Sequence, residues 1–232
     1  MKQSQVSLLP FVGALLLAAI VTLYLFLRFT LLPTTSPLTN TTNTFEPAGN
    51  PLVTGVGSPT VTEPTTRSDD FSYGASDAPV KIVIFSDFDC PYCRDMATLL
   101  KNEVDTNKKA RIVWRDFPVS SVHPEALVAH TAAWCAGREG KFWELHDALF
   151  AATDHSQDNL LTLGSQIGLK SNTFRACMES TEAKNMVLRN VQEGNALGVD
   201  GTPYLFINDQ RVSGLITAEE LTQTINLHAS KP

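Results

Sequence analysis

The sequence predicts an α/β domain that is interrupted by a helical insertion and preceded by one transmembrane helix and a linker. Three observations lead to this prediction. An uncharged apolar segment lies near the N-terminus, and a stretch rich in Thr and Pro follows it. The rest of the chain then alternates short β-branched runs with helical patterns. The order of strand, helix, strand, helical block, hairpin and helix is typical of a sheet covered by helices.

The apolar segment extends from Leu8 to Leu27, which is the length of about 20 residues that a helix needs to cross a bilayer. Residues 28–32 offer no Ala-x-Ala cleavage site. We therefore expect an uncleaved signal anchor over 8–27 that lies in the lipid bilayer, with residues 1–7 in the cytoplasm. A cleaved signal peptide is the alternative. Lys2 and Arg28 flank the segment equally, so its orientation depends mainly on the chemistry of the domain.

Residues 28–70 are rich in Thr, Pro, Ser and Asn and contain few large apolar side chains. Such a stretch cannot bury enough surface to offset its chain entropy, so a disordered linker is expected. Residues 71–232 are sufficient for one domain with a sizeable core. The chain has a net charge of −6 and no basic run, which argues against nucleic acid as a partner.

The first elements of the domain follow from local patterns. Val80–Phe85 is an apolar, β-branched run that predicts a buried strand. A helix is expected to begin at Cys90-Pro91, because proline is tolerated at the first helical position, and to extend to about Val104. Arg111–Trp114 predicts a second strand.

The helical insertion is expected over about 123–197. Its five predicted helices cover 125–136, 141–151, 159–167, 173–178 and 183–196. Thr202–Ile207 then predicts a third strand, and the turn at Asn208-Asp209 returns the chain as Gln210–Ser213. Thr217 and Glu220 have the spacing of a capping box and predict the start of a final helix.

A cysteine pair, Cys90 and Cys93, stands where the first strand ends and the helix begins. The thiolate is the reactive form of cysteine, and the unpaired N–H groups and positive dipole of a helix N-terminus stabilise an anion. Cys90 is therefore the expected attacking sulfur and Cys93 the resolving one. The alternatives are a structural bridge or a zinc site. Zinc is disfavoured because the chain has no second Cys-x-x-Cys, and no metal or cofactor is expected.

The sequence around this pair resembles a known family. The segments that carry the resemblance are 85–93, 132–136, 140–146 and 198–207, in this order. They resemble DsbA-like thioredoxin-fold proteins, and the similarity covers essentially all of 71–232. The resemblance implies a thioredoxin fold with an inserted helical subdomain and thiol–disulfide exchange at Cys90 and Cys93.

The resemblance also implies that Thr202-Pro203 is a cis peptide that faces the redox pair. Backbone groups of Thr202 would then be exposed beside the sulfurs, where an unfolded substrate strand could pair with them. Pro91 and Tyr92, between the two cysteines, are expected to support the site. Without the resemblance, Pro203 would be read as an ordinary proline at the start of a strand.

One position departs from the family pattern. Many relatives carry an acidic residue six positions before the first cysteine, whereas this chain has Ile84. Asp87 and Asp89 are nearer to the pair, and we expect them to be solvated turn residues rather than proton relays. How Cys93 loses its proton is therefore open at this stage.

Cys135 and Cys177 lie in the expected insertion, each in an apolar helical context. They are either two buried free thiols or a structural disulfide. A comparable second pair in some relatives favours the disulfide, and a catalytic role for this pair is not expected.

The expected function is exchange of the Cys90–Cys93 disulfide with cysteines of unfolded, newly exported proteins, in the direction of an oxidase. A reductase or isomerase is one alternative, and a non-catalytic tethered binding module is another. A membrane redox partner is expected to restore the pair. The redox domain is expected on the extracytoplasmic side of the cytoplasmic membrane, because structural and catalytic disulfides persist there.

Overall fold

The computed structural model describes residue 22 and residues 62–230. The predicted anchor Leu8–Leu27 lies outside this range except for Thr22, and so does most of the predicted linker. Among the residues that the structure describes, no helix is long and apolar enough to cross a membrane.

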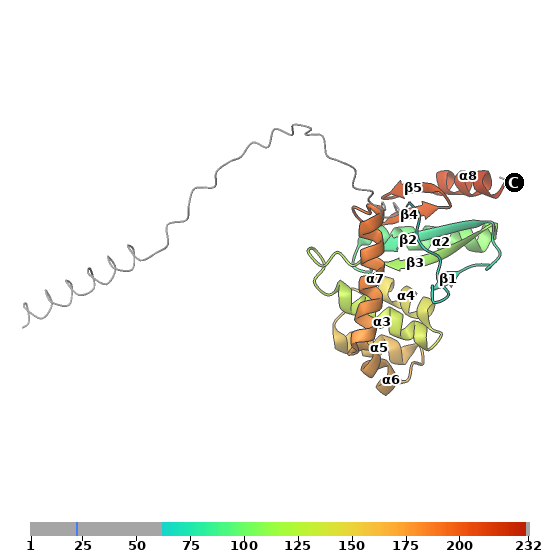
Figure 1. The fold of residues 1–232 in the computed structure, drawn as a ribbon. Helices are drawn as coiled ribbons and strands as arrows, with labels where there is room; N and C mark the ends of the chain where they lie inside the picture. The colour runs from blue at the N-terminus through green and yellow to red at the C-terminus, as the bar shows by residue number, and fades with distance from the viewer. Residues whose placement is uncertain (1–21, 23–61, 231–232) are drawn as a thin grey trace, which may run out of the picture. The chain divides into compact units, whose positions relative to one another are not determined.

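A mixed five-stranded sheet forms the centre of the domain (Figure 1). The strand order is β1-β3-β2-β4-β5. The strands are β1 (Ser72–Tyr73), β2 (Val80–Ser86), β3 (Ala110–Asp116), β4 (Tyr204–Ile207) and β5 (Gln210–Ser213). Only β2 and β3 run parallel, and the other three pairs are antiparallel. The α/β prediction is confirmed, and the short edge strand β1 was not predicted.

Helices cover both faces of the sheet. The helices α2 (Pro91–Asn107) and α8 (Ala218–Ala229) share one hydrophobic core with Ile82 and Ile84 of β2. The last residue of α7 (Thr181–Leu197), Leu197, packs with Val83 and Phe85 on the opposite face. Alternating side chains of β2 therefore enter two different layers, as the period of two in a strand requires. The predicted capping box at Thr217 and Glu220 begins α8.

The inserted helices lie together at one side of the sheet (Figure 1). They are α3 (Ala126–Arg138), α4 (Phe142–Ala151), α5 (Gln157–Gln166) and α6 (Ser171–Met178). A disulfide joins Cys135 in α3 to Cys177 in α6, with an S–S distance of 2.00 Å. The disulfide links α6 to α3, the first helix of the insertion, and its two cysteines are 42 positions apart in the sequence.

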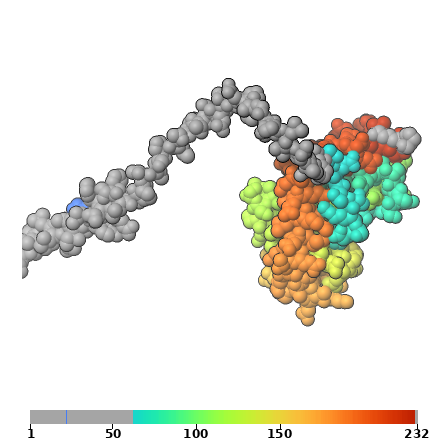
Figure 2. Space-filling view, viewed as in Figure 1, coloured from blue at the N-terminus to red at the C-terminus, as the bar shows by residue number. Residues whose placement is uncertain are grey.

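The last part of the predicted linker differs from the expectation. Residues 62–70 lie against the domain, and they are held by β3, β5 and α7 instead of remaining free. The guanidinium of Arg115 binds the carboxylate of Asp70. The Arg115 side chain is only 1% exposed, so water does not compete for this ion pair. It also donates to the carbonyl of Thr65. We call residues 62–70 the strap. Figure 2 shows its turquoise segment beside the orange helix α7.

Two more contacts fix the strap to α7. The Arg67 guanidinium lies 2.8 Å from the carboxylate of Glu193 and 3.0 Å from the side-chain oxygen of Asn190. Glu193 also binds Arg115 at 2.9 Å. Sequence composition missed this docking because it depends on buried charges supplied by β3 and α7, which lie far along the chain.

Removing the Arg115 side chain should destabilise the protein strongly. Arg115→Ala leaves the buried Asp70 carboxylate without its guanidinium partner and leaves Glu193 with Arg67 alone. Breaking such a buried pair costs roughly 3–5 kcal/mol. Arg189→Ala is the matched control, because its ion pair with Asp69 is about 40% exposed and surface pairs contribute at most about 1 kcal/mol. Urea denaturation of both variants measures the difference. Equal losses of stability would contradict a buried anchoring role for Arg115.

Candidate redox site

The redox pair lies where β2 ends and α2 begins. Pro91 is the first residue of α2, and Cys90 precedes it with an extended backbone. Proline needs no N–H partner at this position, so the helix can start directly after Cys90. The backbone N–H groups of Cys93 and Arg94 both donate to the Cys90 carbonyl, at 3.1 and 3.2 Å. Both cysteines are free thiols in this structure, and neither sulfur is broadly exposed.

The Cys90 thiol faces Thr202. Its sulfur lies 3.6 Å from the Thr202 carbonyl oxygen, to which the neutral thiol donates. The peptide bond between Thr202 and Pro203 is cis. A hydrogen bond from the Cys93 thiol favours the Cys90 thiolate most, partial burial opposes it, and the Cys93 and Tyr92 N–H groups add to the stabilisation. Together they lower the pKa of Cys90 to about 6.

The Cys93 thiol has the opposite environment. It is completely buried among apolar side chains of α2 and β2. Burial raises the pKa of Cys93 far above its ordinary value, and the neighbouring Cys90 raises it further. At neutral pH the reduced pair therefore has one thiolate, on Cys90, and one buried thiol, on Cys93. This asymmetry is the one that disulfide exchange requires of an attacking and a resolving sulfur.

An open cavity of about 280 Å³ lies beside the pair. Its lining residues are Tyr92, Thr202, Pro203, Gly214 and Leu215. The Tyr92 and Leu215 side chains are 59% and 52% exposed, although both are large and apolar. Three of the residues proposed from the sequence to support the site, Tyr92, Thr202 and Pro203, thus lie together at one rim, while Pro91 starts the helix.

Asp87 is not a solvated turn residue, and this expectation was wrong. Its side chain is completely buried. The carboxylate accepts hydrogen bonds from the Val119 N–H at 2.7 Å and from the Asp89 N–H at 2.9 Å. A third contact joins it to His123 Nδ1 at 2.8 Å. The loop after β3 supplies Val119 and His123 and covers Asp87. The local sequence could not reveal this burial, because the loop is distant in the chain.

A buried histidine lies behind Asp87. His130 Nδ1 is 2.7 Å from the Asp116 carboxylate, and His130 Nε2 is 3.8 Å from Asp87. Burial alone would lower the pKa of His130, but Asp116 and Asp87 together raise it to about 9. For Asp87, burial acts in the opposite direction and raises the pKa. Hydrogen bonds and charge from His130, Val119 and His123 outweigh burial and hold the pKa of Asp87 well below its ordinary value. His130 is therefore a cation between two carboxylates.

The low pKa of Asp87 decides its chemical role. A carboxylate that is held ionised by several donors is a poor proton acceptor at neutral pH. Asp87 therefore does not replace the acidic relay that is absent at Ile84, which lies in the apolar core. What Asp87 does provide is position: its backbone N–H donates to the Cys93 sulfur at 3.4 Å.

The two residues between Asp87 and Cys90 attach the motif to the helical insertion. Phe88 is buried in a group of rings, with centroids 4.8 Å from Trp114 and 5.1 Å from Phe150. Asp89 binds His155 Nδ1 at 2.6 Å. Sequence reasoning found no partner for His155, His130 or His123, because their partners lie far away in the sequence, in the motif loop and, for His130, also in β3.

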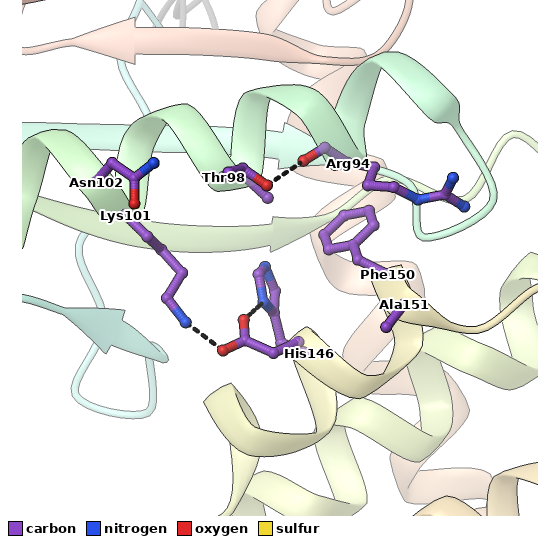
Figure 3. A pocket seen from close by; sticks show the side chains of 9 residues that line it. Arg94, Thr98, Lys101, Asn102, His146, Phe150 and Ala151 are labelled. Atoms are coloured by element: carbon purple, nitrogen blue, oxygen red, sulfur yellow. Dashed lines mark hydrogen bonds and ion pairs between the residues drawn. The ribbon is translucent and has the colours of Figure 1, made fainter.

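A second groove lies between α2 and α4, and Figure 3 shows it from close by. The Lys101 ammonium and His146 Nδ1 both bind the Asp147 carboxylate, while Arg94 extends away from them. Burial lowers the pKa of His146, so its imidazole is neutral at neutral pH. His146 packs among aromatic rings, with Trp143 and Phe150 both within 5 Å between centroids. The charges of Lys101 and Asp147 neutralise each other, and no cysteine lines the groove.

Comparison with known proteins agrees with this geometry. A family model described as thioredoxin matches residues 66–227. Among curated proteins, a Na(+)/H(+) antiporter NhaA 3 from Salinispora tropica is 31% identical over 163 residues. That alignment covers 70% of this chain and 25% of the antiporter. The chain thus spans about a quarter of the length of such relatives.

Solved structures share the fold at low sequence identity. A thioredoxin-like oxidoreductase from Silicibacter pomeroyi DSS-3 has a TM-score of 0.66 and 24% identity, and the match covers 72% of this chain and 95% of that one. The thiol-disulfide exchange protein alpha-DsbA2 from Wolbachia pipientis has a TM-score of 0.62 and 22% identity, over 67% and 85% of the two chains. BdbD from Bacillus subtilis has a TM-score of 0.63 and 18% identity, over 70% and 94%.

The family match covers the sheet and the inserted helices together, and the two free cysteines occupy the start of α2 with opposite protonation. The chain therefore belongs to the thioredoxin family, and it shares its fold with the thiol-disulfide exchange protein alpha-DsbA2.

Proposed function

We propose that this oxidoreductase donates the Cys90–Cys93 disulfide to cysteines of unfolded, newly exported proteins. The observation that carries the proposal is the unequal environment of the two sulfurs. Cys90 has a pKa of about 6 and reaches the rim of the site, whereas Cys93 is a buried thiol. Cys90 is thus the sulfur that a substrate can attack or leave from.

The exchange proceeds in two substitutions at sulfur. A substrate thiolate attacks Cys90 Sγ, the Cys90–Cys93 bond breaks, and its electron pair leaves on Cys93, which then takes up a proton. A second substrate thiolate attacks the substrate sulfur of the mixed disulfide and expels the Cys90 thiolate. The substrate dithiol is oxidised by two electrons, and the enzyme disulfide is reduced by two.

The low pKa of Cys90 favours the oxidase direction. The groups that stabilise its thiolate act only in the reduced protein, because the disulfide carries no charge at this sulfur. Stabilising the reduced form makes the disulfide a stronger oxidant, and a thiolate of low pKa is also a good leaving group. A reductase would need the opposite balance.

The rim beside Cys90 suits an unfolded polypeptide. Tyr92 and Leu215 offer exposed apolar surface on both sides of the Thr202 backbone. An extended chain can therefore place an apolar side chain in this cavity while its own cysteine reacts with Cys90. Folded proteins rarely present a cysteine next to an apolar side chain in extended backbone, so newly exported chains are the proposed substrates.

We further propose that Leu8–Leu27 anchors the domain to the cytoplasmic membrane, with 71–232 on the extracytoplasmic side. The uncharged length of this segment supports the anchor. The disulfide between Cys135 and Cys177 supports the location, because structural disulfides persist in oxidising compartments. A membrane redox partner would restore the Cys90–Cys93 disulfide after each turnover.

Alkylation should select Cys90 over Cys93. With limiting iodoacetamide at pH 6, the reduced protein should be labelled at Cys90, and the labelling rate should rise with pH through a midpoint near the pKa of about 6. Peptide mapping identifies the labelled residue, and Cys90→Ser is the control that should remain unlabelled at this pH. Preferential labelling of Cys93 would contradict the assignment of the attacking sulfur.

The equilibrium with glutathione should identify an oxidant. If the Cys90 thiolate is stabilised as described, the reduction potential should lie above the value of about −270 mV that is typical of a reductant, in the direction of about −120 mV for a strong oxidant. Mass spectrometry of alkylated protein across defined glutathione buffers gives the value. A potential at the reducing end would overturn the oxidase direction and leave the exchange chemistry intact.

Replacing Cys93 with Ser should trap substrates. Without the resolving sulfur, Cys90 should accumulate mixed disulfides with exported proteins in the membrane fraction of cells that express the full chain. Diagonal electrophoresis detects them, and the double variant Cys90→Ser/Cys93→Ser is the matched control. Trapped partners drawn from the cytoplasm would refute the proposed location, and a folded variant without any partner would refute protein exchange.

A further inference from the structure

The last residue of β2, Ser86, has a hydroxyl group that the mechanism above does not use. Ser86 has the same strand parity as Ile82 and Ile84, whose side chains enter the core shared with α2. Because side chains alternate along a strand, the Ser86 side chain faces the layer that contains Cys93. Its backbone is fixed by β3, since it pairs with Asp116 and its carbonyl accepts from the Phe117 N–H at 2.9 Å.

The Ser86 hydroxyl is buried and unsatisfied. The residue is 0% exposed, and its Oγ forms no hydrogen bond with any residue that the structure describes. Leaving a buried polar group unpaired costs folding free energy, so such groups are rare and often have a role in another state of the protein. The structure contains the reduced pair with a neutral Cys93 thiol, which is one state of the redox cycle.

The Cys93 sulfur is the group near Ser86 that changes charge during the cycle. The Ser86 side chain and the Asp87 N–H both lower the pKa of Cys93, against the larger effect of burial. The Asp87 N–H already contacts this sulfur at 3.4 Å. It is held there because the Asp87 carboxylate is clamped by the Val119 N–H and by His123. The Ser86 side chain and the Asp87 N–H, from consecutive residues, therefore both act on the same sulfur.

We propose that the Ser86 hydroxyl and the Asp87 N–H form a two-donor site for the Cys93 thiolate, in place of the acidic relay that is absent at Ile84. The inference rests on the proposed exchange activity and names further residues that touch the reacting sulfur. When the Cys90–Cys93 bond breaks, the electron pair moves to Cys93, and the hydroxyl turns to donate to it. In the reverse step, Cys90 is bound to a substrate sulfur as a mixed disulfide. The Cys93 proton passes to solvent, the same donors stabilise the Cys93 thiolate, and this thiolate attacks Cys90 Sγ and expels the substrate thiolate.

The donors act on a short-lived charge and not on the stable end states. In the disulfide Cys93 carries no charge, and in the reduced protein it is a neutral thiol to which Ser86 makes no hydrogen bond. Interactions that form only while charge is present accelerate a reaction without changing its equilibrium. Loss of the hydroxyl should therefore slow exchange while the reduction potential stays unchanged, which a general structural defect would not do.

The test follows resolution of a mixed disulfide on the full chain. Reduced protein reacts with the aromatic disulfide dithiobis(nitrobenzoate), so that the Cys90 thiolate takes one aromatic sulfur and releases the other as a thiolate. Cys93 then attacks Cys90 Sγ and expels the second coloured aromatic thiolate. Ser86→Ala should slow this release about threefold to tenfold below the pKa of Cys93, because one hydrogen bond to a charged sulfur is lost and part of the loss is offset by a more basic thiolate. The reduction potential should match the wild type, and the melting temperature should not fall, because the variant removes a buried hydroxyl that has no partner.

Thr131→Ala is the matched control, because it also removes a buried hydroxyl, in α3, whose bond goes to the Leu127 carbonyl. It should release the aromatic thiolate at the wild-type rate. Wild-type release by Ser86→Ala at every pH, or equal slowing by both variants, would overturn the donor role. A shifted potential in Ser86→Ala would also overturn it, because Ser86 would then act on a stable state. A wild-type protein that releases nothing would instead refute the exchange function itself.

Discussion

Two cysteines that are three residues apart must have opposite environments, and the junction between β2 and α2 supplies both. Cys90 stands just outside the helix, where N–H groups and the Thr202 backbone meet it, and Cys93 lies one turn inside, in the apolar layer between helix and sheet. Helical geometry turns Cys93 inward while Cys90 remains at the rim. The position of α2 on the sheet therefore fixes the difference in pKa on which the exchange chemistry depends.

The junction is held from the side of the helical insertion. Phe88 is buried among rings of β3 and α4, Asp89 binds His155, and Asp87 binds the loop after β3. These contacts attach the insertion to the redox motif. The insertion supplies His130, whose positive charge permits the ionised Asp87 carboxylate to remain buried. A buried charge of this kind would be strongly destabilising without a partner.

The same buried polar chain reaches the opposite side of the domain. Asp116 binds His130 through one oxygen and Asn190 of α7 through the other, at 2.8 Å. Asn190 in turn accepts from Arg67 of the strap. The strap, which is the last part of the predicted linker, is thus attached to the domain through polar groups that are connected to the redox motif. The strap binds α7 and β3, and the rim formed by Tyr92 and Leu215 stays exposed.

The sequence by itself determined the features that depend on near neighbours. The β-branched run of β2, the proline after Cys90, the spacing to Cys93 and the capping box at Thr217 each act within a strand or a helical turn, so their outcome could be predicted. The resemblance to DsbA-like proteins added the cis peptide before Pro203, which residue patterns alone did not favour.

Only the tertiary structure decided which polar groups are buried. In the sequence, Asp87 and Ser86 are ordinary residues of a turn and of a strand end, and the strap is rich in Thr like the rest of the predicted linker. Their burial depends on Val119, His123, Arg115 and α7, which are distant in sequence. The burial of a short polar side chain is set by whichever segments fold over it, and not by its neighbours in the chain. The reactive pair was therefore readable from sequence, whereas the groups proposed to control its charge were not.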